Sequence, residues 1–197
     1  MIPYLVDLEV VFNFGEIKEM EELRSLTLSL NNSRQFKPLK ALADMISPEL
    51  YARLLKVKPF EDSLFLEELS YRTRVYVITN LPKVDAKSLL LRSNLDVFVQ
   101  DVISAEEVGK FLPAREILEF GVRRANSVVG ATTFLTASLP YALPSRELGM
   151  RVVLLRRNYR VPESLGIIQV PSLGRLAEIT AQQRVDGTMG DSALRCT

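Results

Sequence analysis

Five side chains that could do chemistry lie at the ends of three apolar runs. Asp7 and Glu9 end the first run, Thr79 and Asn80 end the second, and Lys110 follows the third. An acid can attack as a nucleophile, and a hydroxyl with neighbouring N–H groups can hold a phosphate oxygen. A lysine can neutralise the charge between the two. Taken singly, each also has a plain structural interpretation: Asp7 and Thr79 as turn caps, Glu9 as a solvated acid and Lys110 as a surface lysine.

The composition excludes several other chemistries. The 197 residues contain no His and a single cysteine, Cys196. Serine–histidine and cysteine–histidine nucleophiles, histidine-bound zinc, thiolate clusters and an internal disulfide are therefore ruled out. We expect a cytoplasmic protein without a membrane partner, because MIPYLV lacks a basic flank and no apolar run approaches about 20 residues.

Strand-like and helix-like segments alternate through most of the chain. We expect strands at 2–8, 74–79, 96–102, 127–130, 151–155 and 166–170, and helices at 60–71, 83–93, 113–125, 139–148 and 172–183. Such alternation is typical of an α/β protein with a doubly wound, Rossmann-like parallel sheet. Ligands bind beyond the carboxyl ends of the strands in such sheets, where the five side chains lie.

A helical segment interrupts this alternation after the first strand. Helices are expected at 16–30, 38–46 and 48–57, the last two with an early Pro. The sequence thus predicts a core domain of 1–14 and 59–185, a helical insert of 15–58 and a flexible tail of 186–197.

Four segments from about residue 58 to 180 carry a family resemblance: KPFEDSLFLEEL, VYVITN, DVISAEEVGKFLPAREILEFGV and ELGMRVVLLRR. In this order they resemble the haloacid dehalogenase-like (HAD-like) superfamily, whose members are mostly phosphatases. The resemblance implies a catalytic set of Asp7 as nucleophile, Glu9 and Lys110. It implies phosphate binding by Thr79, Asn80 and Lys110, with the insert as a small cap over the site.

Two motifs depart from the family pattern. Glu9 replaces the second acid of the first motif, and Val10 and Val11 replace its Gly and Thr. The fourth motif, which normally carries magnesium-binding acids, reads GATTFLTASLPYALPSRELGM and has no carboxylate before Glu147. In this alignment Ala131 takes the position of the metal-binding Asp, which leaves Asp7 as the remaining ligand for magnesium.

Three functional hypotheses follow from this pattern. The first is a degenerate HAD-like domain, catalytically weak or silent, that binds a small phosphorylated ligand or a protein partner; Thr132 and Thr133 would add hydroxyls to its anion-binding crevice. The second is a magnesium-dependent phosphohydrolase with Asp7 as nucleophile. The third is a metal-independent haloacid dehalogenase, which the lack of an acid in the fourth motif disfavours.

Basic residues outnumber acidic ones in the second half of the chain, by 12 to 7 from residue 110 onward, although the net charge of the whole chain is only +1. That balance provides no overall field to attract nucleic acid. A local surface for nucleic acid or a protein partner is expected at Arg156, Arg157 and Arg160, against the simpler interpretation of a solvated face.

Overall fold

The chain forms a six-stranded, all-parallel sheet, as the sequence predicts. The computed structural model describes residues 1–33, 35–157 and 166–185, with the side chains of 183–185 left out. The strand order is β3-β2-β1-β4-β5-β6. The strands are β1 Pro3–Asp7, β2 Arg74–Thr79, β3 Asp101–Ser104, β4 Thr133–Thr136, β5 Arg151–Leu155 and β6 Ile168–Val170. The order reverses at β1, which lies between β2 and β4.

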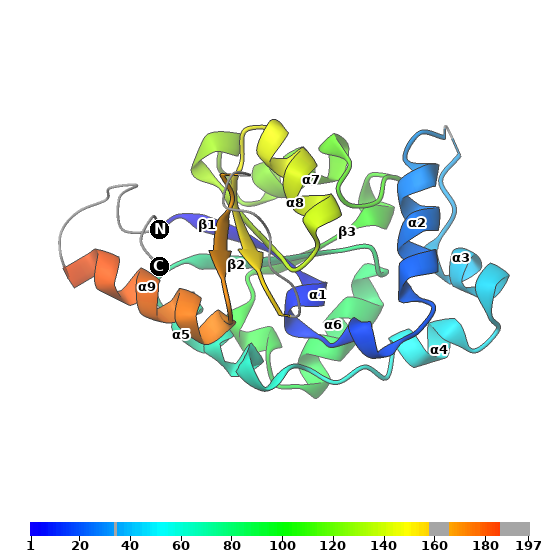
Figure 1. Cartoon of the computed structure of the whole chain (residues 1–197), viewed down its shortest axis with the longest axis horizontal. Coiled ribbons are helices and arrows are strands. Elements are labelled where there is room, and N and C mark those ends of the chain that lie inside the picture. The colour runs from blue at the N-terminus through cyan, green and yellow to red at the C-terminus, as the bar shows by residue number, and fades with distance from the viewer. Residues whose placement is uncertain (34, 158–165, 186–197) are drawn as a thin grey trace.

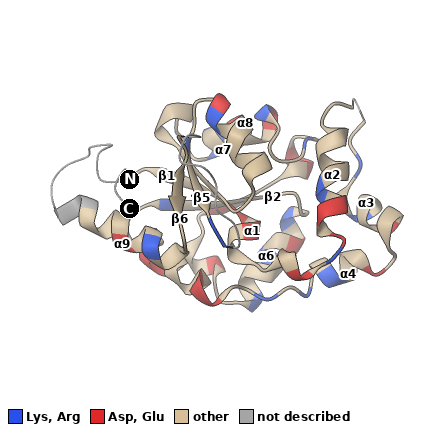
Figure 2. Ribbon diagram, in the orientation of Figure 1, with Lys and Arg blue, Asp and Glu red and all other residues tan. Residues whose placement is uncertain are grey.

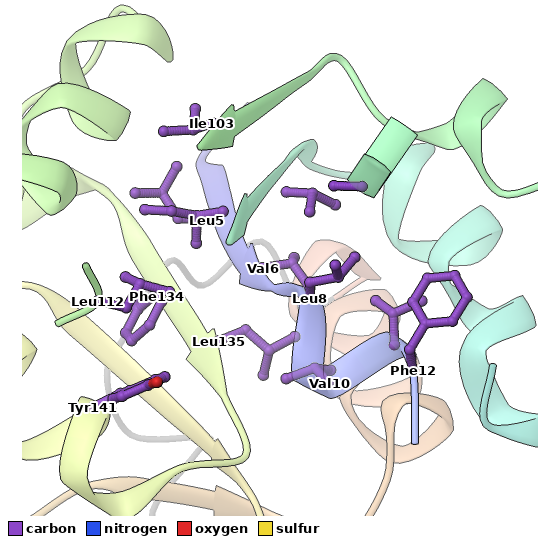
Figure 3. Close-up of a cluster of buried hydrophobic side chains, with 14 of the residues drawn as sticks. Leu5, Val6, Leu8, Val10, Phe12, Ile103, Leu112, Phe134, Leu135 and Tyr141 are labelled. Carbon is purple, nitrogen blue, oxygen red and sulfur yellow. The ribbon is translucent and has the colours of Figure 1, made fainter. Parts of the chain in front are cut away.

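The central strands are buried on both faces, which explains their continuous apolar sequences. Leu5 of β1 is level with Phe134 of β4, and both side chains point to one face of the sheet (Figure 3). Val6 and Leu135 are the next pair along the strands and point to the other face (Figure 3). Burial of these aliphatic and aromatic side chains removes apolar surface from water and stabilises the sheet.

Helices cover both faces of the sheet (Figure 1). The layer that contains α7 and α8 covers one face, and α5, α6 and α9 cover the other (Figure 1). Gly121 allows α7 to approach the sheet closely, because a Cβ there would lie 2.9 Å from Leu5 Cδ1. Their bounds are α5 Leu66–Ser70, α6 Lys83–Arg92, α7 Arg115–Arg124, α8 Leu139–Glu147 and α9 Leu173–Val185; the short 3₁₀ helices between elements are η2 Glu61–Phe65, η3 Asp96–Phe98, η4 Ala105–Glu107 and η5 Val129–Ala131.

The helical insert leaves and rejoins the core at neighbouring points. After α1 (Leu8–Val11), Phe12 forms an antiparallel bridge with Pro59, and the Phe60 N–H donates to the Val11 carbonyl at 2.9 Å. Between these points lie η1 Phe14–Glu16, α2 Met20–Leu30, α3 Leu39–Ile46 and α4 Leu50–Leu54. The last three helices lie together at one end of the molecule (Figure 1). The bridge thus lies close to the boundaries expected from the sequence.

The fourth strand lies further along the chain than expected. Residues 127–130 were expected to be the strand, but Val129–Ala131 forms a 3₁₀ turn and the strand is Thr133–Thr136. The apolar pair before Gly130 suggested a strand, yet Val128 is exposed whereas all four residues of β4 are buried. The alignment of Ala131, Thr132 and Thr133 with a ligand-binding strand end is therefore wrong. These residues lie at the amino end of β4, opposite the site.

The third strand is also displaced from the expected position. Residues 96–102 alternate in polarity, but Asp96–Phe98 forms a 3₁₀ turn and β3 begins at Asp101. Several helices are shorter than their patterns suggested, and the first helix of the insert begins at Met20 rather than at residue 16. Ile17, in the loop before α2, carries an apolar side chain that periodicity alone assigns to the helix.

Arg157 belongs to the fold rather than to an open surface. Its Nη2 donates to the Val10 carbonyl at 2.6 Å and to Asp62 Oδ1 at 2.9 Å. Its guanidinium carbon lies 3.6 Å from the centre of the Phe60 ring. Asp62 Oδ2 in turn accepts the N–H of Leu173, the first residue of α9. The guanidinium is thus committed to internal partners.

Charges of both signs are spread over the molecule, in line with the small net charge (Figure 2). Arg160 and the tail of 186–197 lie outside the described residues. Within the described ranges, each helix is too short or too polar to cross a membrane.

We expect Arg157→Ala to lower the free energy of unfolding by about 2–4 kcal/mol, because Asp62 and the Val10 carbonyl would lose a mostly buried partner. The matched control is Arg115→Ala, which removes an exposed arginine paired with Glu119 and should cost at most about 0.5 kcal/mol. Urea denaturation of the three proteins measures the difference. Equal losses in the two variants would contradict the structural role of Arg157.

Candidate functional site

The candidate site lies where the strand order reverses. The adjacent strands β2, β1 and β4 end in Thr79, Asp7 and Thr136. In each case a side-chain oxygen of this last residue accepts the N–H group two residues on, at 3.0, 3.1 and 3.1 Å respectively. These turns leave the sheet sharply and bring the three oxygens to one edge. The capping interpretation of Asp7 and Thr79 is thus correct, and it coexists with their position in the site.

Asp7 is buried at the centre of this edge. Its Oδ2 accepts the Thr136 hydroxyl at 2.7 Å, while its Oδ1 caps α1. Burial, followed by the negative charge of Glu9, raises the pKa of Asp7 from 3.8 to about 8. The two hydrogen bonds favour the ionised form but are outweighed. Asp7 therefore retains its proton through much of the neutral range.

A salt bridge between core and insert closes the site from one side. Arg24 Nη2, from α2, lies 2.6 Å from Glu9 Oε2, and both side chains are mostly buried. Arg24 also binds Glu21 on its own helix. Burial opposes the charge of Arg24, but its acidic neighbours, chiefly Glu9, outweigh this and raise its pKa. The cation that faces the strand ends thus comes from the insert.

Sequence reasoning missed Arg24. Met20, Leu23, Arg24 and Thr27 all line the cavity, and they follow the i, i+3, i+4, i+7 spacing of one helix face. The position of Arg24 among Met20, Leu23 and Thr27, on the helix face that turns inward, was the sequence signal that could have identified it as a site residue. It was obscured because α2 carries several other charged residues.

Tyr141 was also missed, and it extends the site toward β4. Its buried hydroxyl accepts Asn80 Nδ2 at 3.2 Å, while Asn80 Oδ1 accepts the Leu112 N–H at 2.7 Å. Burial, together with the nearby charges of Glu9 and Asp7, raises the pKa of Tyr141 well above its usual value. With the corrected end of β4 at Thr136, Tyr141 is five residues beyond the strand, where the sequence provides a phenol instead of a carboxylate.

These side chains surround a small, mostly apolar cavity. Its volume is about 30 Å³, enough for about two water molecules. Of the described residues that line it, the charged or titratable acids and bases are Asp7, Glu9, Arg24 and Tyr141, with Thr27, Thr79 and Asn80 as further polar members; the rest are Leu8, Phe14, Met20, Leu23, Leu39, Leu54, Leu81 and Leu112. The structure therefore brings four of the five predicted side chains together.

Lys110 is the predicted site residue that the structure places elsewhere. Its Nζ donates to the carbonyls of Asn31 and Ser33 at 2.7 and 3.1 Å. The Asn31 side chain pairs with both the N–H and the carbonyl of Phe111 at 2.9 Å each. The ring of Phe36 lies 4.9 Å from that of Phe111. Lys110 thus helps to fasten the insert to the core, and it does not line the cavity.

Comparison with solved structures identifies the architecture. The L-2-haloacid dehalogenase of Xanthobacter autotrophicus superposes with a TM-score of 0.78 at 12% identity, over 96% of this chain and 100% of its own. The chain has a HAD-like fold. A HAD phosphatase from Thermococcus onnurineus gives a TM-score of 0.68 at 18% identity, over 91% of this chain and 97% of its own. No known protein-family profile and no curated sequence matches the chain.

Magnesium is a plausible cofactor of a HAD-like fold, but it does not fit the side chains of this cavity. A putative HAD-hydrolase from Bacillus subtilis, described as bound to magnesium, superposes with a TM-score of 0.64 at 16% identity, over 90% of this chain and 97% of its own. Here the described residues include no cluster of three metal-binding side chains. The cavity offers Asp7, whose carboxyl group already binds the Thr136 hydroxyl, and Glu9, which already binds Arg24. The guanidinium would repel a divalent cation at this position.

We expect the Glu9–Arg24 pair to be energetically coupled. Glu9→Gln or Arg24→Met alone should cost about 3 kcal/mol, because each leaves a mostly buried charge without its partner. The double variant should recover about 1–3 kcal/mol of the summed loss. Urea denaturation checks this, with the more exposed Arg175–Glu178 pair as control, where a coupling below about 0.5 kcal/mol is expected. Equal coupling in both pairs would show that burial does not strengthen the Glu9–Arg24 interaction.

We expect the stability of the protein to fall as the pH rises through the pKa of Asp7. The folded-state pKa of about 8 lies above the ordinary value of 3.8, so the fold favours the protonated form. The resulting stabilisation is complete below about pH 4 and is lost as the pH rises through about 8. Asp7→Asn removes this dependence. Urea denaturation from pH 5 to 9 should therefore show that the free energy of unfolding of the variant rises relative to that of the wild type as the pH increases. If the two free energies change with pH in parallel, the raised pKa of Asp7 is contradicted.

Proposed function

We propose that the protein is a catalytically silent HAD-like domain that acts as a binding or assembly module, with the insert as a cap held closed over the strand ends. The observation that carries this proposal is the Glu9–Arg24 salt bridge, which joins core and insert across a cavity of about 30 Å³. We further propose a cytoplasmic location, on the ground of the single cysteine.

The electrostatics of the cavity disfavour the binding of a phosphate group. Arg24 is the cation among the described lining residues, and it is shared between Glu9 and Glu21. A phosphate dianion would meet Glu9 and, above about pH 8, an ionised Asp7 without a cation to spare. Lys110, which the sequence assigned to this task, is bound to insert carbonyls. The expected anion-binding crevice is therefore not part of the proposal.

The same side chains disfavour hydrolysis. A phosphohydrolase would need magnesium or another cation to screen the nucleophile from the phosphate. The Arg24 guanidinium would repel magnesium at this position. After β4 the chain provides Ser138 and Tyr141, and the next carboxylate along the sequence is Glu147. A buried phenol with a raised pKa is a poor base for activating water at neutral pH.

We expect no turnover of p-nitrophenyl phosphate, with or without magnesium, that exceeds the rate of Asp7→Asn. The reason is that magnesium does not fit the cavity and that Glu9, the carboxylate beside Asp7, is held by Arg24. Product release is followed by absorbance over a pH series from 5 to 9, because Asp7 ionises within that range. Magnesium-dependent turnover that is lost in Asp7→Asn would overturn the silent-domain proposal in favour of the phosphohydrolase.

A second candidate function, metal-independent displacement at carbon, is favoured by one observation. Asp7 faces an apolar cavity beside a cation, and attack on a small haloacid would need no metal. The Asp7 carboxylate would form an ester with the carbon while the halide leaves with the bonding electrons. Since Glu9, the other carboxylate among the described lining residues, is held by Arg24 and is not free to act as a base, the ester would not be hydrolysed and the reaction would stop after one equivalent.

Incubation with 2-chloropropionate followed by intact-protein mass spectrometry separates the two candidates. The silent-domain proposal gives an unchanged mass, and Asp7→Asn serves as the control. One adduct per chain at Asp7, forming faster as the pH rises through about 8, would establish the displacement reaction instead.

A further inference from the structure

Exposed apolar side chains are concentrated on one layer of helices. Of the nine large hydrophobic side chains that are most exposed among the described residues, six belong to the layer made by η2, α5, η3 and α6. Five of them, each 60–75% exposed, are Leu64, Tyr71, Val84, Leu91 and Val97. Such concentration on a surface is typical of an interaction site rather than of scattered exposure.

The layer carries two stripes with the same spacing and opposite charge. The acidic stripe consists of Leu64, Glu67, Glu68 and Tyr71, and the basic stripe of Val84, Lys87, Ser88 and Leu91. Both have the i, i+3, i+4, i+7 spacing with an apolar residue at each end; the basic stripe lies on α6, whereas the acidic stripe runs from η2 through α5 to the residue that follows it. All eight side chains are exposed. The buried residues of α6 are Ala86, Leu89 and Leu90, so its basic stripe faces away from the sheet.

The two stripes are neighbours in the fold. Both α5 and α6 lie on the same face of the sheet (Figure 1). The turn η3 contacts both helices and presents Val97, which is among the most exposed apolar side chains. The layer thus carries an acidic stripe, a basic stripe and the exposed apolar side chain of Val97.

We propose that this face binds the same face of a second copy of the chain around a two-fold axis that passes between α5 and α6. Two-fold symmetry places the acidic stripe of each copy against the basic stripe of the other, so the charged contact is formed twice. Lys87 of one copy then meets Glu67 and Glu68 of the other, while the apolar residues at the stripe ends pack together. This inference rests on the assembly role proposed above and names a second copy of the chain as the partner.

Charge complementarity within a single face is the reason for choosing a second copy. A partner that matched one stripe alone would leave the other stripe exposed or facing a like charge, whereas a second copy satisfies both. The local contacts of the acidic stripe, Tyr71 to Glu67 at 2.7 Å and Arg72 to Glu68 at 2.6 Å, leave both carboxylates on the surface to accept Lys87.

The first test is the mass of the full chain in solution by sedimentation equilibrium. We expect a dimer whose dissociation constant rises about tenfold or more in Leu91→Glu, since a charge would be buried in an apolar contact. Val128→Glu is the matched control, because Val128 is 67% exposed and Leu91 62%, and it lies outside the layer. A monomer up to about 100 µM, or equal weakening in the two variants, would overturn the proposal.

The second test exchanges the charges. Lys87→Glu alone, and Glu67→Lys/Glu68→Lys alone, should each be monomeric, because like charges then meet at both symmetry-related contacts. In an equimolar mixture, a heterodimer carries opposite charges at both contacts, so mixing should restore the dimer. Circular dichroism of each variant verifies that it is folded. Failure to associate on mixing, when the wild type is a dimer, would place the interface elsewhere.

Both outcomes are independent of the proposed silence of the site. A monomeric protein without phosphatase activity would overturn the dimer proposal and agree with the silent-domain proposal. A dimer with Asp7-dependent turnover would agree with the dimer proposal and overturn the silent-domain proposal.

Discussion

The salt bridge between Glu9 and Arg24 is the interaction on which the rest of the site depends. It joins the turn after β1 to the first helix of the insert, so it sets the distance between core and insert at the strand ends. Transfer of both charges from water is costly, and only direct contact repays it. The pair therefore favours one closed arrangement. Burial is the main cause of the raised pKa of Asp7, and the carboxylate of Glu9, which this arrangement holds close by, raises that pKa further.

The topology of the sheet determines which side chains can meet at that point. Because β1 lies between β2 and β4, the last residues of these three strands share one edge, although they are far apart in the sequence. Their side chains carry out two tasks at once. Each caps the turn that follows its strand; Asp7 and Thr79 also line the cavity, while Thr136 donates its hydroxyl to Asp7. Capping therefore does not distinguish a structural from a functional role here.

The parallel sheet and the grouping of most of the cluster could be predicted from the sequence, because these depend on burial and alternation. Asp7, Glu9, Thr79 and Asn80 were found as residues at the ends of apolar runs, and the structure brings them together. The end of β4 was missed because Val128 and Val129 resemble a strand, and burial, which a single sequence does not reveal, decided between the two segments. Arg24 was missed, and Lys110 was expected at the cavity, for a related reason: which partner a long cationic side chain reaches depends on how the insert packs.

Arg24 of the insert binds Glu9 of the core, and Lys110 of the core binds carbonyls of the insert, so both contacts oppose movement of the insert away from the core. If the insert moved away, Arg24 would leave with it, and Glu9 would face Asp7 without a screening charge. Lys110 would lose its carbonyl partners and Asn31 its paired contacts with Phe111. Water entering the opened cavity would solvate Glu9 and offset part of this loss. The remainder still opposes opening, because the hydrogen bonds and the salt bridge would be lost together. A ligand that binds only the open form would therefore have to supply that free energy itself.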